Sequence, residues 1–342
     1  MRVLKIKGRY GKSNIILGES ITNLGKYCPS GKTVIITDRK VRNIYGNLFP
    51  AFDVIEIGAG EQSKTLDTAA NIYKKFLELE VDRTSFVVGI GGGIVCDVTG
   101  FAASTYMRGI RFGFVPTTLL AQADASIGGK NGVNFMRYKN IIGAFNQPQF
   151  VLCDFRLLKT LQMRELKCGF AEIIKHAAIG DSALFAYLEK NRARLLSLPK
   201  DVIEKVLYNS VSVKAKIVSI DETEQSERRK LNFGHTFGHA IEKTAHIPHG
   251  EAISIGMTVA AKLSVFKGLL TKEDAHRIEA LLRALDLPTR ITADKNAVVD
   301  AIKKDKKRYG AKINFALLEG IGKAKIVGIK LTELESVAND LR

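Results

Sequence analysis

Residues 86–100, FVVGIGGGIVCDVTG, join a continuous apolar run to a cluster of glycines and then to a helical pattern. A short apolar run of this kind is typical of a strand covered on both faces of a parallel sheet. The glycines lie where exposed amides and a helix N-terminus can receive a pyrophosphate. The segment departs from the dinucleotide fingerprint G-x-G-x-x-G, because Ile94 stands where the third glycine would fall. Tight packing of a helix on the sheet is an alternative explanation for the glycines.

Similar apolar runs recur on both sides of this stretch and alternate with helical patterns, such as the one over 64–80. They are NIILG (14–18), KTVIITD (32–38), FDVIEIG (52–58), IRFGFVPT (110–117) and FVLCDF (150–155). The alternation predicts a mostly parallel, Rossmann-like α/β sheet in a nucleotide-binding domain over residues 1–155.

From residue 156 onward, long helical patterns replace the strand signals. They cover 163–180, 182–193, 199–219, 250–268, 272–285 and 294–305, and two β-like runs, INFALLE and KAKIVGI, interrupt them. The pattern predicts a mainly α-helical second domain over residues 156–342.

Composition narrows the class of protein. With 342 residues, 46% of them hydrophobic and 25% charged, the chain is long enough for two globular domains. The most apolar stretch, 86–96, is far shorter than the roughly 20 residues that cross a bilayer, so no membrane association is expected. The N-terminus alternates apolar and basic residues like a strand rather than a signal peptide. The four cysteines form no C-x-x-C pair, and together these features favour a cytoplasmic location.

The formal net charge of +17 is compatible with nucleic-acid binding or with anionic ligands. Dense basic clusters occur only at 227–230 and 303–308, and no interleaved stacking aromatics accompany them. We therefore expect anionic small molecules, and no nucleic acid, as partners.

Two further segments suggest anion or ribose contacts but leave alternatives open. Asp38 closes a predicted strand, where a carboxylate can bind a ribose diol or cap a helix. DASIGGKNG (124–132) is not a Walker motif, because Asp124 replaces the first glycine and Asn131 follows the lysine. Its glycines and Lys130 can cradle a phosphate, although an ordinary glycine turn explains them equally well.

Four of the six histidines lie within residues 235–249. His235 and His239 are four residues apart, so spacing alone selects them as a metal-binding pair on one helix face. The absence of H-E-x-x-H argues against a metalloprotease. A third ligand is available in GFAEIIKHAAIG (169–180), where Glu172 and Lys175 lie on an apolar helix. A buried ion pair between these two residues is the alternative to a metal ligand.

Six segments occur in one order that resembles the 3-dehydroquinate synthase family of sugar phosphate cyclases. They are GGGIVCDVTGFAASTYMRG, VPTTLLAQADASIGGKNGVN, KNIIGAFNQP, GFAEIIKH, LNFGHTFGHAIE and HGEAISIGM. The resemblance implies NAD in the first domain and one divalent metal, zinc or cobalt. It assigns the metal to Glu172, His235 and His249, and gives His239 to the substrate phosphate instead.

The resemblance also assigns the remaining contacts. The positions that match NAD contacts are Asp38, Glu61, Lys64, Gly92, Gly93, Asp97, Thr117, Thr118, Lys130, Lys139 and Thr160. The positions that match substrate contacts are Lys130, Asn140, His239 and Lys323 for the phosphate, Arg228 and Lys214 for a carboxylate, and Asp124, Lys139, Lys175 and Asn232 for the rest of the pocket. Arg108 matches an arginine that reaches the partner's site in a homodimer.

The implied reaction converts 3-deoxy-D-arabino-heptulosonate 7-phosphate to 3-dehydroquinate and phosphate. It proceeds through transient NAD-dependent oxidation at C5, phosphate elimination, re-reduction, ring opening and an intramolecular aldol closure. A substrate with a phosphate and a carboxylate requires a pocket rich in lysine and arginine.

Overall fold

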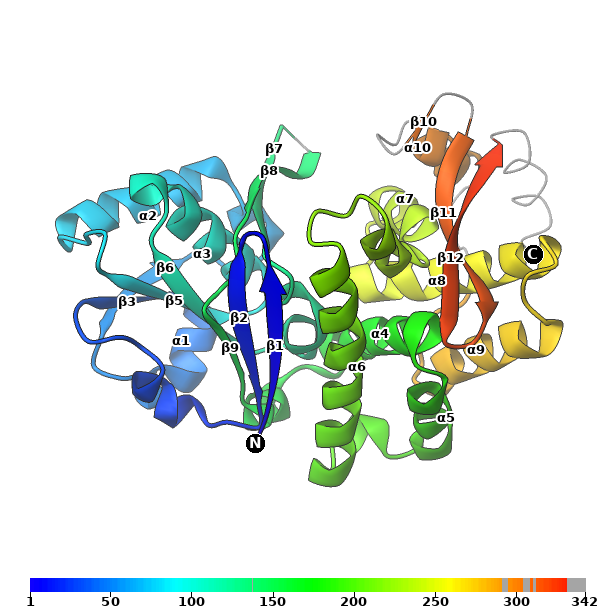
Figure 1. Cartoon of the computed structure of the whole chain (residues 1–342), viewed down its shortest axis with the longest axis horizontal. Coiled ribbons are helices and arrows are strands. Elements are labelled where there is room, and N and C mark those ends of the chain that lie inside the picture. Colours follow the sequence, from blue (N-terminus) through cyan, green and yellow to red (C-terminus); the bar gives the residue numbers. More distant parts are fainter. Residues whose placement is uncertain (137, 291–294, 304–307, 310–311, 331–342) are drawn as a thin grey trace. The chain divides into compact units, whose positions relative to one another are not determined.

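A computed structural model of the chain describes residues 1–136, 138–290, 295–303, 308–309 and 312–330 (Figure 1). The chain divides into two compact units. The first comprises Met1–Leu161 with Lys214–Thr223, and the second comprises Gln162–Val213 with Glu224–Arg342. The last part of one long helix, α6 (Lys200–Ile220), therefore belongs to the first unit by its contacts.

The first unit is built on a seven-stranded sheet in the order β1-β2-β9-β6-β5-β3-β4. Its strands are β1 (Arg2–Gly8), β2 (Gly11–Leu17), β3 (Thr33–Asp38), β4 (Asp53–Ile57), β5 (Phe86–Gly91), β6 (Arg111–Pro116) and β9 (Phe150–Cys153). From β2 to β4 neighbouring strands are parallel, and only the edge strand β1 is antiparallel to its neighbour. The prediction of a mostly parallel α/β sheet is confirmed.

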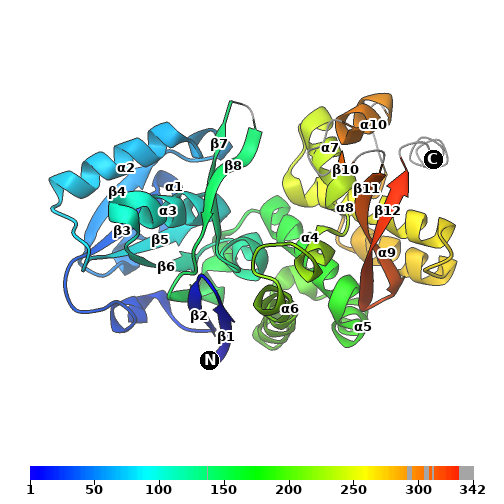
Figure 2. The same cartoon turned by 45° about the horizontal axis from the view of Figure 1, so that its top comes forward.

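Helices α1 (Arg39–Tyr45), α2 (Leu66–Glu78) and α3 (Gly93–Thr105) accompany this sheet. All six residues of β5 are buried, because the strand lies inside the sheet with a covering layer on each face. The sequence did not reveal the antiparallel hairpin of β7 (Lys130–Phe135) and β8 (Tyr138–Phe145), which Figures 1 and 2 show rising beside α3. Glycine and asparagine in β7 weaken its strand signal.

The second unit is mainly helical, with a small antiparallel sheet. Its helices are α4 (Met163–Gly180), α5 (Ser182–Asn191), most of α6, α7 (His235–Ala245), α8 (His249–Phe266), α9 (Lys272–Ala284) and α10 (Lys295–Lys303). Its strands are β10 (Arg308–Tyr309), β11 (Lys312–Gly320) and β12 (Lys323–Lys330). The predicted helices and β-like runs are thus found. Residues 294 and 304–305 of the helix predicted at 294–305, and residues 304–307 of the basic cluster 303–308, lie outside the described residues.

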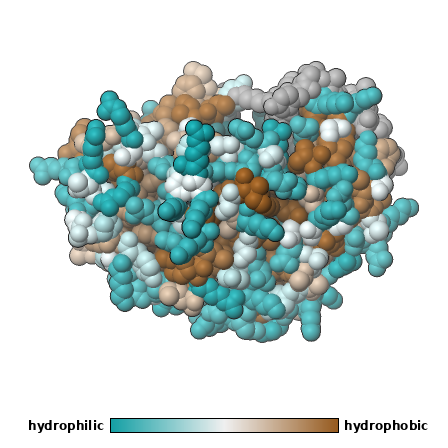
Figure 3. Space-filling view, viewed as in Figure 1, coloured by the Kyte–Doolittle hydropathy of each residue, from teal (hydrophilic) through white to brown (hydrophobic). Residues whose placement is uncertain are grey.

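An apolar core joins α7, α8 and β11, with Phe237, Val259 and Phe315 among its buried side chains. On the face drawn in Figure 3, hydrophilic residues are spread over both ends, and hydrophobic residues gather in patches between them. Among the described residues, no helix is long and apolar enough to cross a membrane.

Candidate active site

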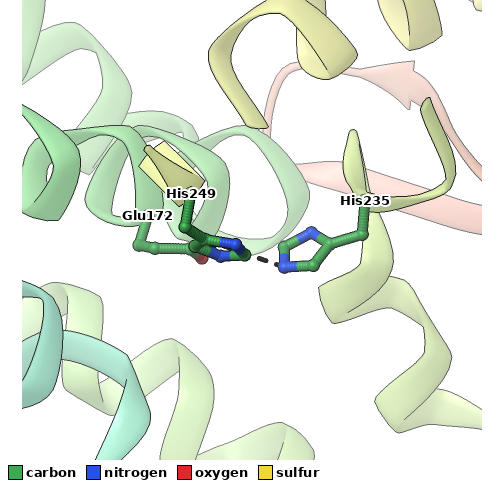
Figure 4. A group of neighbouring side chains, drawn as sticks. All are labelled: Glu172, His235 and His249. Atoms are coloured by element: carbon green, nitrogen blue, oxygen red, sulfur yellow. Dashed lines mark hydrogen bonds and ion pairs between the residues drawn. The ribbon is translucent and has the colours of Figure 1, made fainter. Parts of the chain in front are cut away.

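Three helices of the second unit bring a carboxylate and two imidazoles together (Figure 4). Glu172 comes from the middle of α4, while His235 and His249 are the first residues of α7 and α8. The Nε2 atoms of His249 and His235 lie 3.2 and 3.6 Å from the same oxygen of Glu172. One ligand atom from each residue lies within 4.8 Å of the others. One oxygen and two imidazole nitrogens are a donor set that zinc prefers.

Glycines allow these helices to approach closely. A Cβ added at Gly250 would lie 2.3 Å from the Cα of Cys168 on α4, and one at Gly256 would lie 2.0 Å from the carbonyl oxygen of Gly234 before α7. Real Cβ atoms do not occur at such distances. Because Gly250 directly follows His249 and Cys168 lies one turn before Glu172, the contact between α4 and α8 sets the separation of these two side chains.

Each histidine of this group is held through its second ring nitrogen. His235 Nδ1 lies 3.3 Å from the carbonyl oxygen of Phe233, and His249 Nδ1 lies 3.2 Å from a carboxylate oxygen of Glu242. A carbonyl can only accept, so Nδ1 of His235 carries the proton and Nε2 presents its lone pair toward Glu172 in the neutral ring. The rings are therefore oriented as metal ligands require.

Glu172 and Lys175 form the buried ion pair that the sequence left as an alternative. Both side chains are almost fully buried, and Lys175 Nζ contacts the second oxygen of Glu172. The ion pair and a ligand role are compatible, because the two oxygens of the carboxylate face different partners. Lys175 fixes the carboxylate so that the other oxygen faces the histidines.

His239, which spacing alone selected, has a different environment. It is exposed, and its ring centroid lies 5.2 Å from that of His235 and 6.0 Å from that of His249. It could form a second ligand group with Glu242 and His249. Helical spacing correctly predicts that His235 and His239 are neighbours, but it does not identify which residues from other helices join them.

The imidazoles of His235 and His249 have opposite pKa shifts. Burial and the positive charge of Lys175 lower the pKa of His235 well below its usual range, so this ring is neutral and has a lone pair to donate. For His249, burial lowers the pKa, but hydrogen bonds with Glu172 and Glu242 outweigh it and raise the value to about 9. A metal ion must therefore displace a proton from His249 at neutral pH.

In the first unit, the residues predicted to contact NAD follow the carboxyl ends of parallel strands. Asp38 ends β3, Gly92 and Gly93 follow β5, Thr117 and Thr118 follow β6, Glu61 and Lys64 follow β4, and Thr160 follows β9. In the sheet, β3 lies between β4 and β5, so the connection after β3 leads to one neighbour and the connection after β4 crosses to the other. Such a switch in strand order opens a crevice at the carboxyl edge, the usual ligand site of α/β sheets.

Local contacts at this edge bear on the alternative roles of Asp38 and of the glycine cluster. Asp38 caps α1, accepting from the Val41 amide at 2.9 Å, so the helix-cap explanation holds for one of its oxygens. Gly92 caps α3 without a side chain, leaving the first amides of the helix directed toward any anion there. A Cβ at Gly89 would meet Thr99 at 2.9 Å, so tight packing also explains part of the glycine cluster.

Two ion pairs involve residues of the predicted sites in this unit. Lys64 Nζ lies 2.5 Å from the carboxylate of Asp97. Burial raises the pKa of Asp97, although the charge of Lys64 opposes this shift. Lys214 on α6 lies 2.6 Å from both the carboxylate and the carbonyl oxygen of Asp124. Sequence spacing gave no indication of the second pair, which joins residues 90 positions apart.

Five further residues lie on or beside the hairpin. Gly128 and Gly129 form a turn with φ of 104° and 70°, and Lys130 then begins β7 with an exposed side chain. Lys139 lies 4.0 Å from Glu61. Asn140, at φ 52°, donates its amide to Asn134.

The other predicted residues are dispersed over their units. Arg228 is 3% exposed, and Asn232 bonds with Glu224. Lys323 pairs with Glu319 at 3.2 Å and its side chain is 75% exposed. Arg108 is exposed, and its backbone φ is positive, like those of its neighbours Met107 and Gly109.

The fold is that of a class of protein, the sugar phosphate cyclases. The structure is similar to a 2-deoxy-scyllo-inosose synthase complexed with carbaglucose-6-phosphate, NAD+ and Co2+, with a TM-score of 0.89 and 27% identity over 100% of both chains. It is also similar to the 2-epi-5-epi-valiolone synthase of Streptomyces hygroscopicus subsp. jinggangensis 5008 with NAD+ and Zn2+ bound. That match has a TM-score of 0.88 and 29% identity over 100% of this chain and 99% of the other.

Within this class, the chain belongs to the 3-dehydroquinate synthase family. The N-terminal model of that family matches residues 54–168, and the C-terminal model matches residues 169–308. The chain is 45% identical to the 3-dehydroquinate synthase of Thermoanaerobacter pseudethanolicus over 333 residues, covering 94% of this chain and 93% of the relative. Its activity is that of a lyase, which converts 3-deoxy-D-arabino-heptulosonate 7-phosphate to 3-dehydroquinate and phosphate.

Proposed function

We propose that Glu172, His235 and His249 hold one zinc or cobalt ion for this reaction, and that the carboxyl edge of the first unit's sheet holds NAD. The observation that supports the metal site most strongly is the convergence of both Nε2 atoms on one oxygen of Glu172. When bound, the metal would polarise the C5 alcohol of the substrate, and the nicotinamide would oxidise it transiently.

The chain's own residues bind and orient the substrate in this proposal. Lys130, Asn140, His239 and Lys323 contact the phosphate, Arg228 and Lys214 contact the carboxylate, and Asp124, Lys139, Lys175 and Asn232 contact the rest of the substrate. Cationic side chains suit both anionic ends of the molecule. A buried guanidinium at Arg228 supports recognition of a carboxylate, because the planar fork binds two oxygens at once.

The experiment follows phosphate release from the heptulosonate phosphate with NAD, before and after chelation. We expect chelation to abolish release and zinc or cobalt to restore it, with no net NADH, since the same cofactor is reduced and reoxidised. Glucose 6-phosphate, which lacks the carboxylate, is the control substrate and should release none. Full release from the chelated protein, or NADH accumulating with each turnover, would contradict the proposal.

We propose further that the enzyme is a cytoplasmic homodimer in which Arg108 of each subunit reaches the active site of the partner subunit. The exposed Met107 and Arg108, with φ of 49° and 67°, support a role beyond the monomer, since such backbone strain in residues other than glycine is retained where function requires it. Sedimentation of the wild-type protein tests the dimer. Mixing an Arg108→Ala subunit with a His235→Ala subunit should restore activity at one site of the mixed dimer, whereas a monomer or a mixture without activity would refute it.

A further inference from the structure

Glu242 is a polar residue of α7 that neither spacing nor the resemblance assigns to the site. It lies three residues after His239 and seven after His235, so all three occupy one face of the helix. Phe237 and Ile241, on another face, are buried in the apolar core. The side chain of Glu242 is only 16% exposed, and a carboxylate removed from water in this way requires compensating partners.

One such partner is His249. A carboxylate oxygen of Glu242 lies 3.2 Å from His249 Nδ1, while Nε2 of the same ring lies 3.2 Å from Glu172. The two carboxylates thus hold opposite edges of one imidazole. If a metal takes the place of the proton on Nε2, the proton on Nδ1 remains, and Nδ1–H donates a hydrogen bond to the Glu242 carboxylate.

The two histidines of the group differ in this respect. His235 Nδ1 faces a neutral carbonyl, that of Phe233, whereas His249 Nδ1 faces an anion. Hydrogen bonds to a charged acceptor are roughly twice as strong as those between neutral groups. His249 also needs more support, because it begins α8 after a loop and its side chain is 32% exposed, against 12% for His235.

We propose that Glu242 is a positioning residue for the metal site: it orients the His249 ring and increases the electron density at Nε2. This inference rests on the proposed metal site. Carboxylates that accept a hydrogen bond from the distal N–H of a ligand histidine raise its basicity, and their loss typically weakens metal binding about 10–100-fold. Glu242 acts through His249 and does not itself contact the metal.

The experiment measures zinc affinity by competition with a chromogenic chelator, and the visible absorption of the Co2+-loaded protein. Glu242→Ala should weaken zinc binding about 10–100-fold and change the Co2+ bands, because the ring is released. Glu242→Gln, whose amide oxygen can still accept from Nδ1, should retain the bands and lose less affinity. Thermal melting of the metal-free variants verifies folding.

Glu251→Gln is the matched control. Glu251 lies on the same helix as His249, is 18% exposed and pairs with Arg164 rather than with a histidine. Its substitution removes the same charge near the site without touching the ring, so zinc affinity should not change. Equal losses in the Glu242 and Glu251 variants would show a general charge effect and overturn the proposal, as would wild-type affinity and Co2+ bands in Glu242→Ala.

Two reference variants separate this proposal from the metal site on which it rests. His235→Ala should abolish stoichiometric zinc binding, and if it does not, the proposed site itself is wrong. His239→Ala should leave affinity unchanged. If both His239→Ala and Glu242→Gln abolish binding, Glu242 is a ligand in the alternative group with His239 and His249, and the positioning role is refuted.

Discussion

Substituting Gly250 by alanine tests whether the close contact of α4 and α8 builds the metal site. The added Cβ would lie 2.3 Å from the backbone of Cys168, and ordinary van der Waals contact begins at 3.4 Å. The helices must therefore separate locally by about 1.1 Å, because the obstacle is backbone and cannot rotate away. His249, the preceding residue, moves with its helix away from Glu172.

The magnitudes follow from this displacement. Metal sites tolerate about 0.2 Å of ligand displacement, and the shift here is about 1.1 Å. Loss of a residue that only orients a ligand weakens metal binding about 10–100-fold. Gly250→Ala displaces a ligand itself, so it should weaken zinc binding by at least that factor. Overpacking should also reduce the free energy of unfolding by about 1–3 kcal/mol. Helix propensity alone predicts the opposite sign, a gain of about 0.5–1 kcal/mol.

Urea unfolding of the metal-free protein and zinc competition provide the two readouts. Gly25→Ala is the control, because its Cβ would meet nothing within 4 Å, and it should change the unfolding free energy by less than about 0.5 kcal/mol. A Gly250→Ala protein that is as stable as the wild type and binds zinc equally well would refute the account of how the helices assemble the site.

Two other predictions concern the histidines and a carboxylate of the first unit. His249→Ala should lose bound metal, as measured by metal content after gel filtration, whereas His239→Ala should retain metal and lose turnover; metal loss in both would contradict the assignment. Glu19 has a pKa lowered to about 2 by hydrogen bonds from Asn23, Tyr27 and the Ser20 amide. Because the folded pKa is depressed, its stabilisation is present above about 4.5 and is lost as pH falls toward 2. Solvent screens this partly exposed group, so Glu19→Gln should lower the free energy of unfolding by less than about 1 kcal/mol at neutral pH. The difference from the wild type should vanish as the pH falls from about 4.5 to about 2. A difference that stays constant over this range would exclude the carboxylate as its cause.

The sequence alone determined the type and order of most elements. The apolar run at 86–91 identified a buried strand because its burial on both faces demands continuous hydrophobicity. Long helices such as α4 and α9 followed from their 3.6-residue period. The hairpin at 130–145 escaped because its first strand has weak local propensity, and its position depends on packing against α3.

The site shows the same division. Local spacing placed His235 beside His239, and the family resemblance named Glu172 and His249 as ligands. Only the tertiary structure shows that Glu172, from a helix more than sixty residues earlier in the chain, has one oxygen facing both Nε2 atoms, and that Glu242 holds the opposite edge of His249. Periodicity records which residues share a face of one helix. Which faces meet, and at what distance, is set by the close contacts at Gly250 and Gly256, and these depend on the packing of whole helices against one another.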